Sequence, residues 1–108
     1  MELHIGITGV DEVEVTPANT AEAVGSGTLP VFATPAMLAS MEKAAYESVQ
    51  PYLDEGCGTV GILLNAEHLA ASPIGMRVRT ESELTEIDGR VLTFSVRSYA
   101  GGELIGKG

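Results

Sequence analysis

The chain has 108 residues, of which 44% are hydrophobic, and a formal net charge of −9. This length suits one domain and is too short for two, so we expect a single domain over residues 1–108. The negative charge disfavours a nucleic-acid binder or a protein that binds anionic membranes, because both need a basic face. The sequence contains no run of about 18 apolar residues, so no transmembrane helix is predicted.

Two further features of the sequence concern its location. The N-terminal residues include Glu2, His4 and Asp11 rather than a basic stretch followed by an apolar run, which argues against a signal peptide. Cys57 is the one cysteine, so the sequence holds neither a disulfide framework nor a paired-cysteine metal motif. A cytoplasmic location, where thiols stay reduced, is therefore expected.

The N-terminal third predicts a strand and a loop. Residues 5–16 alternate loosely between valines and acidic residues, which is typical of a strand. Residues 16–20 have the composition of a turn. The stretch Gly25–Gly27 suits a flexible loop or a lid better than a helix.

The clearest predicted element is a helix that starts at Thr34 and Pro35 and ends near Gln50. Threonine is a favoured N-cap and proline a favoured first helical residue. Ala, Leu, Met, Glu and Lys, which dominate this stretch, are strong helix formers. Few charges occur in its first two turns, so we expect a helix that is buried on most sides.

Four strands are predicted after the helix, over residues 59–69, 76–87, 91–99 and from 102 onward. Asp88-Gly89 separates the second and third of these, and such a pair is the strongest short-range signal of a hairpin. One long helix together with an antiparallel sheet indicates an α+β layer architecture.

Two motifs in this order resemble the hotdog-fold thioesterases. The first runs from Val31-Phe32-Ala33-Thr34-Pro35 through the helix to Met41-Glu42, with Gly61 after it. The second is His68-Leu-Ala-Ala-Ser-Pro-Ile-Gly-Met76. The sequence is most similar to the fluoroacetyl-coenzyme A thioesterase group of that superfamily, and the resemblance covers nearly the whole chain.

The resemblance implies an α+β hotdog fold, in which an antiparallel sheet of about five strands wraps around one long central helix. It also implies a homodimer, with a tetramer possible, in which two sheets join and the active sites lie at the subunit interface. The implied substrate is an acyl-coenzyme A. Coenzyme A is then part of the substrate, so no separate cofactor, metal, nucleic acid or membrane partner is expected.

Carried over by motif, the implied catalytic residues are Thr34, Glu42 and His68, and the backbone of Gly61 is expected beside the acyl group. Thr34 either binds or attacks the acyl carbon, and Glu42 acts as a base or as the nucleophile. His68 is suited to move protons near neutral pH. The relatives that act on the fluorinated substrate resemble one another in an aromatic lid before the helix. The stretch Gly25–Leu29 has no aromatic ring, which argues against selectivity for fluoroacetyl groups.

Each of these residues also has a purely structural interpretation. Thr34 alone is a helix cap, Glu42 a carboxylate paired with Lys43, and His68 a hydrogen-bonded structural histidine. Glu67 precedes His68 and is expected on the opposite face of the strand. Arg77 and Arg79 are predicted to bind the coenzyme A phosphates, with Arg90, Arg97 and Lys43 as further cations; their structural interpretation is a solvated strand face.

Two other functions fit the same sequence. One is a non-catalytic module that binds acyl-coenzyme A. The other is a hotdog dehydratase, which the order of the residues disfavours: in those enzymes the histidine typically precedes the helix that bears the acid, whereas His68 follows Glu42.

Overall fold

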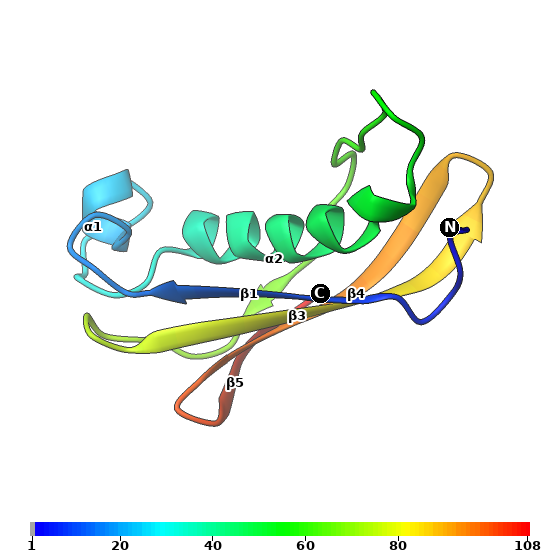
Figure 1. Cartoon of the computed structure of the whole chain (residues 1–108). Helices are drawn as coiled ribbons and strands as arrows, with labels where there is room; N and C mark the ends of the chain where they lie inside the picture. Colours follow the sequence, from blue (N-terminus) through cyan, green and yellow to red (C-terminus); the bar gives the residue numbers. More distant parts are fainter. Residues whose placement is uncertain (1) are drawn as a thin grey trace.

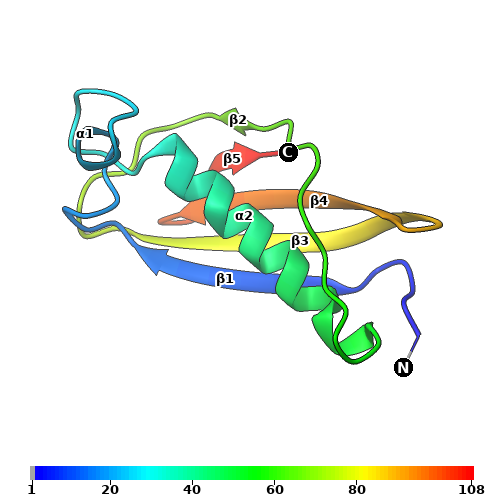
Figure 2. The same ribbon diagram turned by 90° about the horizontal axis from the view of Figure 1, so that it is seen from above.

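The computed structural model describes residues 2–108, and in it one long helix lies across one face of an antiparallel sheet (Figures 1 and 2). The elements are β1 (Thr8–Glu14), α1 (Ala21–Val24), α2 (Thr34–Val49), the 3-10 turn η1 (Gln50–Tyr52), β2 (Glu67–His68), β3 (Arg77–Asp88), β4 (Val91–Ala100) and β5 (Glu103–Lys107). The sheet has five strands in the order β1-β3-β4-β5-β2, and each neighbouring pair is antiparallel. The predicted α+β fold with a sheet of about five strands is confirmed.

The core lies between α2 and the inner face of the sheet. Along β3 the side chains alternate, so Val78 and Leu84 are buried while Arg77 and Arg79 are exposed on the outer face. Met37 and Met41 of α2 are fully buried in the same layer.

Helix α2 is buried along one side only. Its opposite side, which includes Ala39, Glu42, Lys43 and Tyr46, is exposed in this chain. The prediction of a helix buried on most sides is therefore wrong for the chain by itself. The sheet covers only one face of the helix. Because a helix has 3.6 residues per turn, the residues on its opposite face point away from the sheet.

A chain of hydroxyl groups crosses the layer beneath α2. Ser40 donates to Asp11 Oδ2 over 2.8 Å and also lies 3.1 Å from Thr80 Oγ1, which in turn lies 2.7 Å from Ser98 Oγ. Lys43 Nζ lies 3.5 Å from the other carboxylate oxygen of Asp11. These contacts satisfy polar groups that burial would otherwise leave unpaired, and they fix the helix on the sheet.

The helix begins one residue earlier than the capping prediction requires. Ala33 is the N-cap, with extended backbone angles and no capping side chain, and Thr34 is already helical. Thr34 therefore does not cap α2, and its hydroxyl binds the side chain of His68 instead.

The strand predicted over residues 59–69 is much shorter in the structure. Only Glu67 and His68 pair within the sheet, with Lys107 and Gly106 of β5. Figure 2 shows the preceding segment returning from the end of α2 toward the carboxyl end of β5. The partner strand β5 ends at Lys107, opposite Glu67, so residues 59–66 have no strand beside them among residues 2–108 with which to form a ladder.

One short helix was not predicted. The Thr20 hydroxyl accepts a hydrogen bond from the Ala23 N–H and so caps α1 at its start, and Gly25, with φ of 81°, ends it. The isolated bridges Thr20–Phe32 and Val31–Pro73 hold this region near the start of α2. Among the described residues, the helices are too short or too polar to cross a membrane.

Candidate active site

Thr34 and His68, which lie 34 residues apart in the sequence, meet at the start of α2. The Thr34 Oγ1 atom lies 2.7 Å from His68 Nδ1, within hydrogen-bond distance. The first turn of α2 positions the threonine, and the pairing of β2 with β5 positions the histidine. Glu67 is exposed on the other face of β2, as predicted. The fold thus brings together two of the three predicted catalytic residues.

The environment of His68 favours its neutral form. Burial lowers the pKa of His68 below its usual value of 6.5, and the backbone of Ala70 partly opposes this shift. The Nε2 atom is buried and has no hydrogen-bond partner among residues 2–108. A neutral imidazole with one unpaired basic nitrogen is the form that a proton-transfer group needs.

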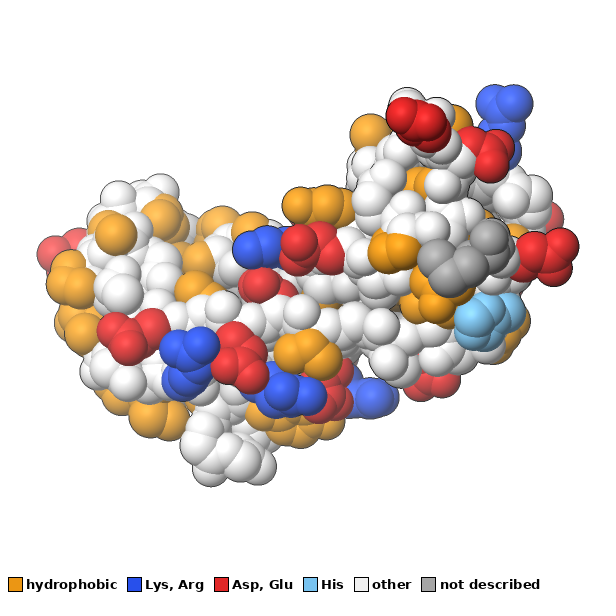
Figure 3. Space-filling view, viewed as in Figure 1, with side chains coloured by type: hydrophobic (Ala, Val, Ile, Leu, Met, Phe, Trp, Pro, Cys, Tyr) orange, Lys and Arg blue, Asp and Glu red, His pale blue; other side chains and the backbone are white. Residues whose placement is uncertain are grey.

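A shallow groove of about 320 Å³ opens beside this pair. Most of its lining side chains are small or apolar: Ala21, Ser26, Val31, Phe32, Thr34, His68, Leu69, Ala70 and Ala71. Figure 3 shows hydrophobic side chains gathered at the end of the molecule that carries α1. The sequence did not predict the contributions of α1 and of residues 69–71, because small residues in a loop carry no chemical signature.

Glu42 contacts the segment that precedes β2. A Cβ atom added at Gly61 would meet a carboxylate oxygen of Glu42, so the absence of a side chain there lets the end of the Glu42 side chain lie against this segment. Among residues 2–108, no hydrogen bond or ion pair joins Glu42 to Thr34 or His68, and Lys43 binds Asp11 instead. The structure therefore places Glu42 against Gly61, which is the position that the resemblance implies lies beside the acyl group.

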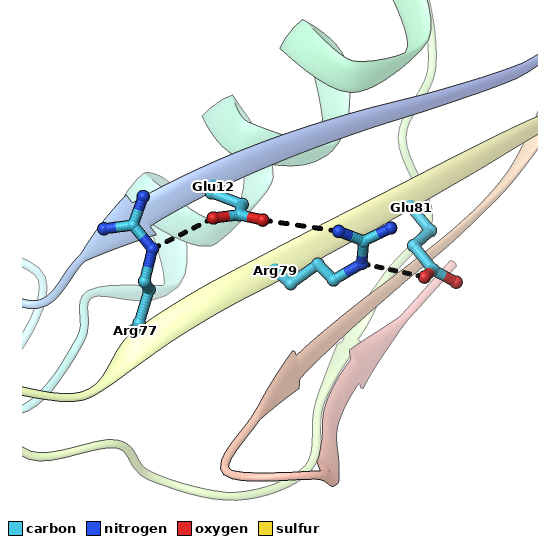
Figure 4. A network of polar contacts seen from close by, with 4 residues as sticks. All are labelled: Glu12, Arg77, Arg79 and Glu81. Atoms are coloured by element: carbon cyan, nitrogen blue, oxygen red, sulfur yellow. Dashed lines mark hydrogen bonds and ion pairs between the residues drawn. The ribbon is translucent and has the colours of Figure 1, made fainter.

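Arg77 and Arg79 lie on the outer face of the sheet, away from α2 (Figure 4). Arg77 Nε donates to Glu12 over 2.9 Å, and Arg79 donates to Glu12 over 3.3 Å and to Glu81 over 3.1 Å. The hydrogen bond from Arg77 and its charge lower the pKa of Glu12. Acidic and basic side chains alternate over this part of the surface (Figure 3). The structure does not bring these arginines to the Thr34–His68 pair, and carboxylates already bind both.

The sequence is similar to that of known proteins. Residues 15–108 match the family described as fluoroacetyl-CoA-specific thioesterase. A fluoroacetyl-CoA thioesterase of Streptantibioticus cattleyicolor is 38% identical over 78 residues, which are 72% of this chain and 56% of that protein. The chain thus spans little more than half the length of this relative.

Two solved structures share the whole architecture. The fluoroacetyl-CoA thioesterase FlK superposes with a TM-score of 0.93 at 30% identity, over 100% of this chain and 84% of FlK. The Thermus thermophilus protein TTHA0967, a thioesterase superfamily member, superposes with a TM-score of 0.87 at 36% identity, over 96% of this chain and 77% of that protein. Since the family match extends over most of the sequence and the fold agrees throughout, the chain belongs to the fluoroacetyl-CoA-specific thioesterase family.

Proposed function

We propose that this protein hydrolyses an acyl-coenzyme A thioester to the free acid and coenzyme A. The observation that carries this proposal is the hydrogen bond between Thr34 and a neutral, partly buried His68 at the edge of a small apolar groove. Family membership and the names of the relatives support the thioester as the substrate class.

The proposed reaction begins with water. Glu42 accepts a proton from a water molecule, whose oxygen adds to the thioester carbonyl carbon. The oxyanion is stabilised by the Thr34 hydroxyl and by the unpaired N–H groups at the start of α2. The carbon–sulfur bond then breaks, and the proton that Glu42 took from the water reaches the departing thiolate by way of His68, so that both residues return to their starting forms. Atoms balance, because one water is consumed for each acid and thiol released.

The tautomer of His68 makes these roles compatible. When His68 carries its proton on Nδ1, it donates to Thr34 Oγ1, and the threonine proton is free for the carbonyl oxygen. The unpaired Nε2 is then the basic atom that takes up and returns a proton.

The active form in this proposal is a homodimer. Val60, Ile62 and Leu63 are 85%, 79% and 86% exposed, in a segment that has no strand beside it. Pairing this segment with its copy in a second chain would satisfy its backbone groups and cover the apolar side chains. Gly61 belongs to this segment and contacts Glu42. A dimer formed through the segment would therefore place the active site at the interface.

Replacing Glu42 with glutamine tests the mechanism. The change keeps the shape of the side chain but removes its basic oxygen, so we expect kcat to fall by a factor of about 10²–10⁴. Hydrolysis of acetyl-, fluoroacetyl-, butyryl- and phenylacetyl-coenzyme A is measured by release of the free thiol. Glu47→Gln, an exposed carboxylate on the same helix, is the matched control and should keep normal turnover.

Two outcomes would contradict this proposal. A folded, dimeric Glu42→Gln protein with normal kcat would show that Glu42 is not the base. A wild-type protein that binds acyl-coenzyme A in calorimetry but releases no thiol from any of the four substrates would instead be a binding module.

A further inference from the structure

The lysines and arginines of this acidic protein differ in whether they form ion pairs. The sequence has six lysines and arginines. Lys43 binds Asp11, and Arg77 and Arg79 bind Glu12 and Glu81. Within residues 2–108, the remaining three cations, Arg90, Arg97 and Lys107, form no ion pair.

Two of these free cations lie directly opposite one another. Arg97 of β4 pairs in register with Lys107 of β5, so both side chains lie on the same face of the sheet. That face is the outer one, because the neighbours Val96 and Ser98 are buried toward α2. Like charges at directly opposed positions repel one another, and a bound anion would relieve this repulsion.

The carboxylates beside this pair form no ion pair with it among the described residues. Glu81 is opposite Arg97 on β3, but it accepts a hydrogen bond from Arg79 over 3.1 Å. Glu67 is opposite Lys107 on β2, yet the two form no ion pair within 4.0 Å among the described residues. A groove of about 270 Å³ lies here, and its lining residues are Asn65, Glu67, Ser95, Val96, Arg97, Lys107 and Gly108.

From this arrangement we propose that Arg97 and Lys107 form a binding site for the phosphate groups of the coenzyme A thioester. An arginine fork beside a lysine is a common way to bind phosphate. The site adjoins the candidate active site, since Lys107 is paired with Glu67, the residue before His68. The identity of the ligand rests on the proposed function, because only a coenzyme A substrate brings phosphates to this edge of the sheet.

The position explains how one substrate would contact both faces. His68 lies on the inner face with Thr34, while Arg97 and Lys107 lie on the outer face, and the edge strand β2 separates them. The pantetheine chain is flexible and joins the thioester to the phosphates, so it would cross this edge. Arg77 and Arg79 are the competing phosphate site, but their guanidinium groups already hold carboxylates.

The test compares two double variants that change the net charge equally, Arg97→Gln/Lys107→Gln and Arg77→Gln/Arg79→Gln. The first readout is the binding of coenzyme A, 3′,5′-ADP and inorganic phosphate, measured by calorimetry at low salt without any turnover. The second is the ratio of kcat/KM for acetyl-coenzyme A to that for acetyl-pantetheine, which lacks the phosphates of the nucleotide.

For Arg97→Gln/Lys107→Gln we expect the affinity for coenzyme A and 3′,5′-ADP to fall by about tenfold or more, and the kcat/KM ratio to fall in proportion. Glu67→Gln removes the nearby negative charge and should tighten the binding of 3′,5′-ADP. Wild-type protein that binds inorganic phosphate as tightly as coenzyme A would point to a general anion site and overturn the assignment.

The same measurements separate this inference from the proposed function. If the Arg77/Arg79 variant loses binding while the Arg97/Lys107 variant does not, the phosphate site is wrong and the thioesterase proposal stands. If coenzyme A binding depends on Arg97 and Lys107 but the wild type releases no thiol, the site is right and the proposed function is wrong.

Discussion

His68 is the residue whose charge state determines the proposed chemistry. Burial lowers its pKa below 6.5, so the imidazole stays neutral at a pH where an exposed histidine would begin to take up a proton. Proton uptake by Nε2 is also costly because that buried atom has no hydrogen-bond partner among residues 2–108 to stabilise the charge. Its geometry with Thr34 is therefore kept best at neutral and higher pH.

This shift predicts how stability depends on pH. Between the lowered pKa of folded His68 and the ordinary value of 6.5, the unfolded chain binds more protons than the folded one. The contribution of His68 to stability is then fully present above about pH 6.5 and is lost as the pH falls below it. Thermal unfolding of the wild type and of His68→Gln, measured from pH 8 to pH 5, checks this expectation.

The wild type should lose more stability than His68→Gln over the acid part of that range. Parallel curves for the two proteins would mean that His68 titrates as an exposed histidine does. The same residue should set the acid limb of the activity profile, because protonated His68 cannot accept a proton.

At the level of elements, α2 approaches β1 closely at Gly9. A Cβ atom at this position would collide with the Ala44 carbonyl oxygen and lie 2.7 Å from Ser48 Cβ. Backbone cannot move aside as the end of a flexible side chain can. The absence of a side chain at Gly9 therefore sets how near the helix lies to the sheet.

We expect Gly9→Ala to destabilise the protein by about 1–3 kcal/mol, because the added methyl group overpacks this contact. Gly58→Ala is the control, since its Cβ would meet only Gln50 Oε1, at 3.9 Å. Urea denaturation measures both variants. Equal stability of Gly9→Ala and the wild type would show that α2 can shift away from β1 without loss of packing.

At the level of the whole molecule, the exposed segment before β2 predicts the assembly. In a dimer formed through this segment, Ile62 lies near the interface, and a lysine there places a charge where apolar surface is buried. We expect Ile62→Lys to sediment as a monomer at micromolar concentration and to lose most of its thioesterase activity, because Gly61 and Glu42 lose the partner chain beside them.

Val91→Lys is the control for this experiment. Val91 is also exposed, at 48%, but it lies at the β3–β4 hairpin, and β5 separates its strand from β2 in the sheet order. The lysine variant at Val91 should remain a dimer with normal turnover. A wild-type protein that sediments as a monomer and is fully active would exclude the dimer as the active form.

The sequence by itself determined the elements whose signals are local. Helix α2 follows from helix-forming residues after Thr34-Pro35, and the β3–β4 hairpin from Asp88-Gly89. The candidate residues Thr34 and His68 also came from the sequence, through motifs in a characteristic order. Each of these signals spans a few residues, so no knowledge of the remaining chain is needed to interpret it.

Only the tertiary structure decided what depends on distant neighbours. The Thr34 hydroxyl binds His68 and does not cap α2, because β2 brings an imidazole within 2.7 Å. The strand predicted at residues 59–69 is reduced to Glu67–His68, because a ladder needs a partner strand and β5 ends at Lys107, opposite Glu67. Arg77 and Arg79 both bind Glu12 of the neighbouring strand, whereas Arg97 and Lys107 form no ion pair within residues 2–108. That difference follows from strand register, which no local pattern encodes.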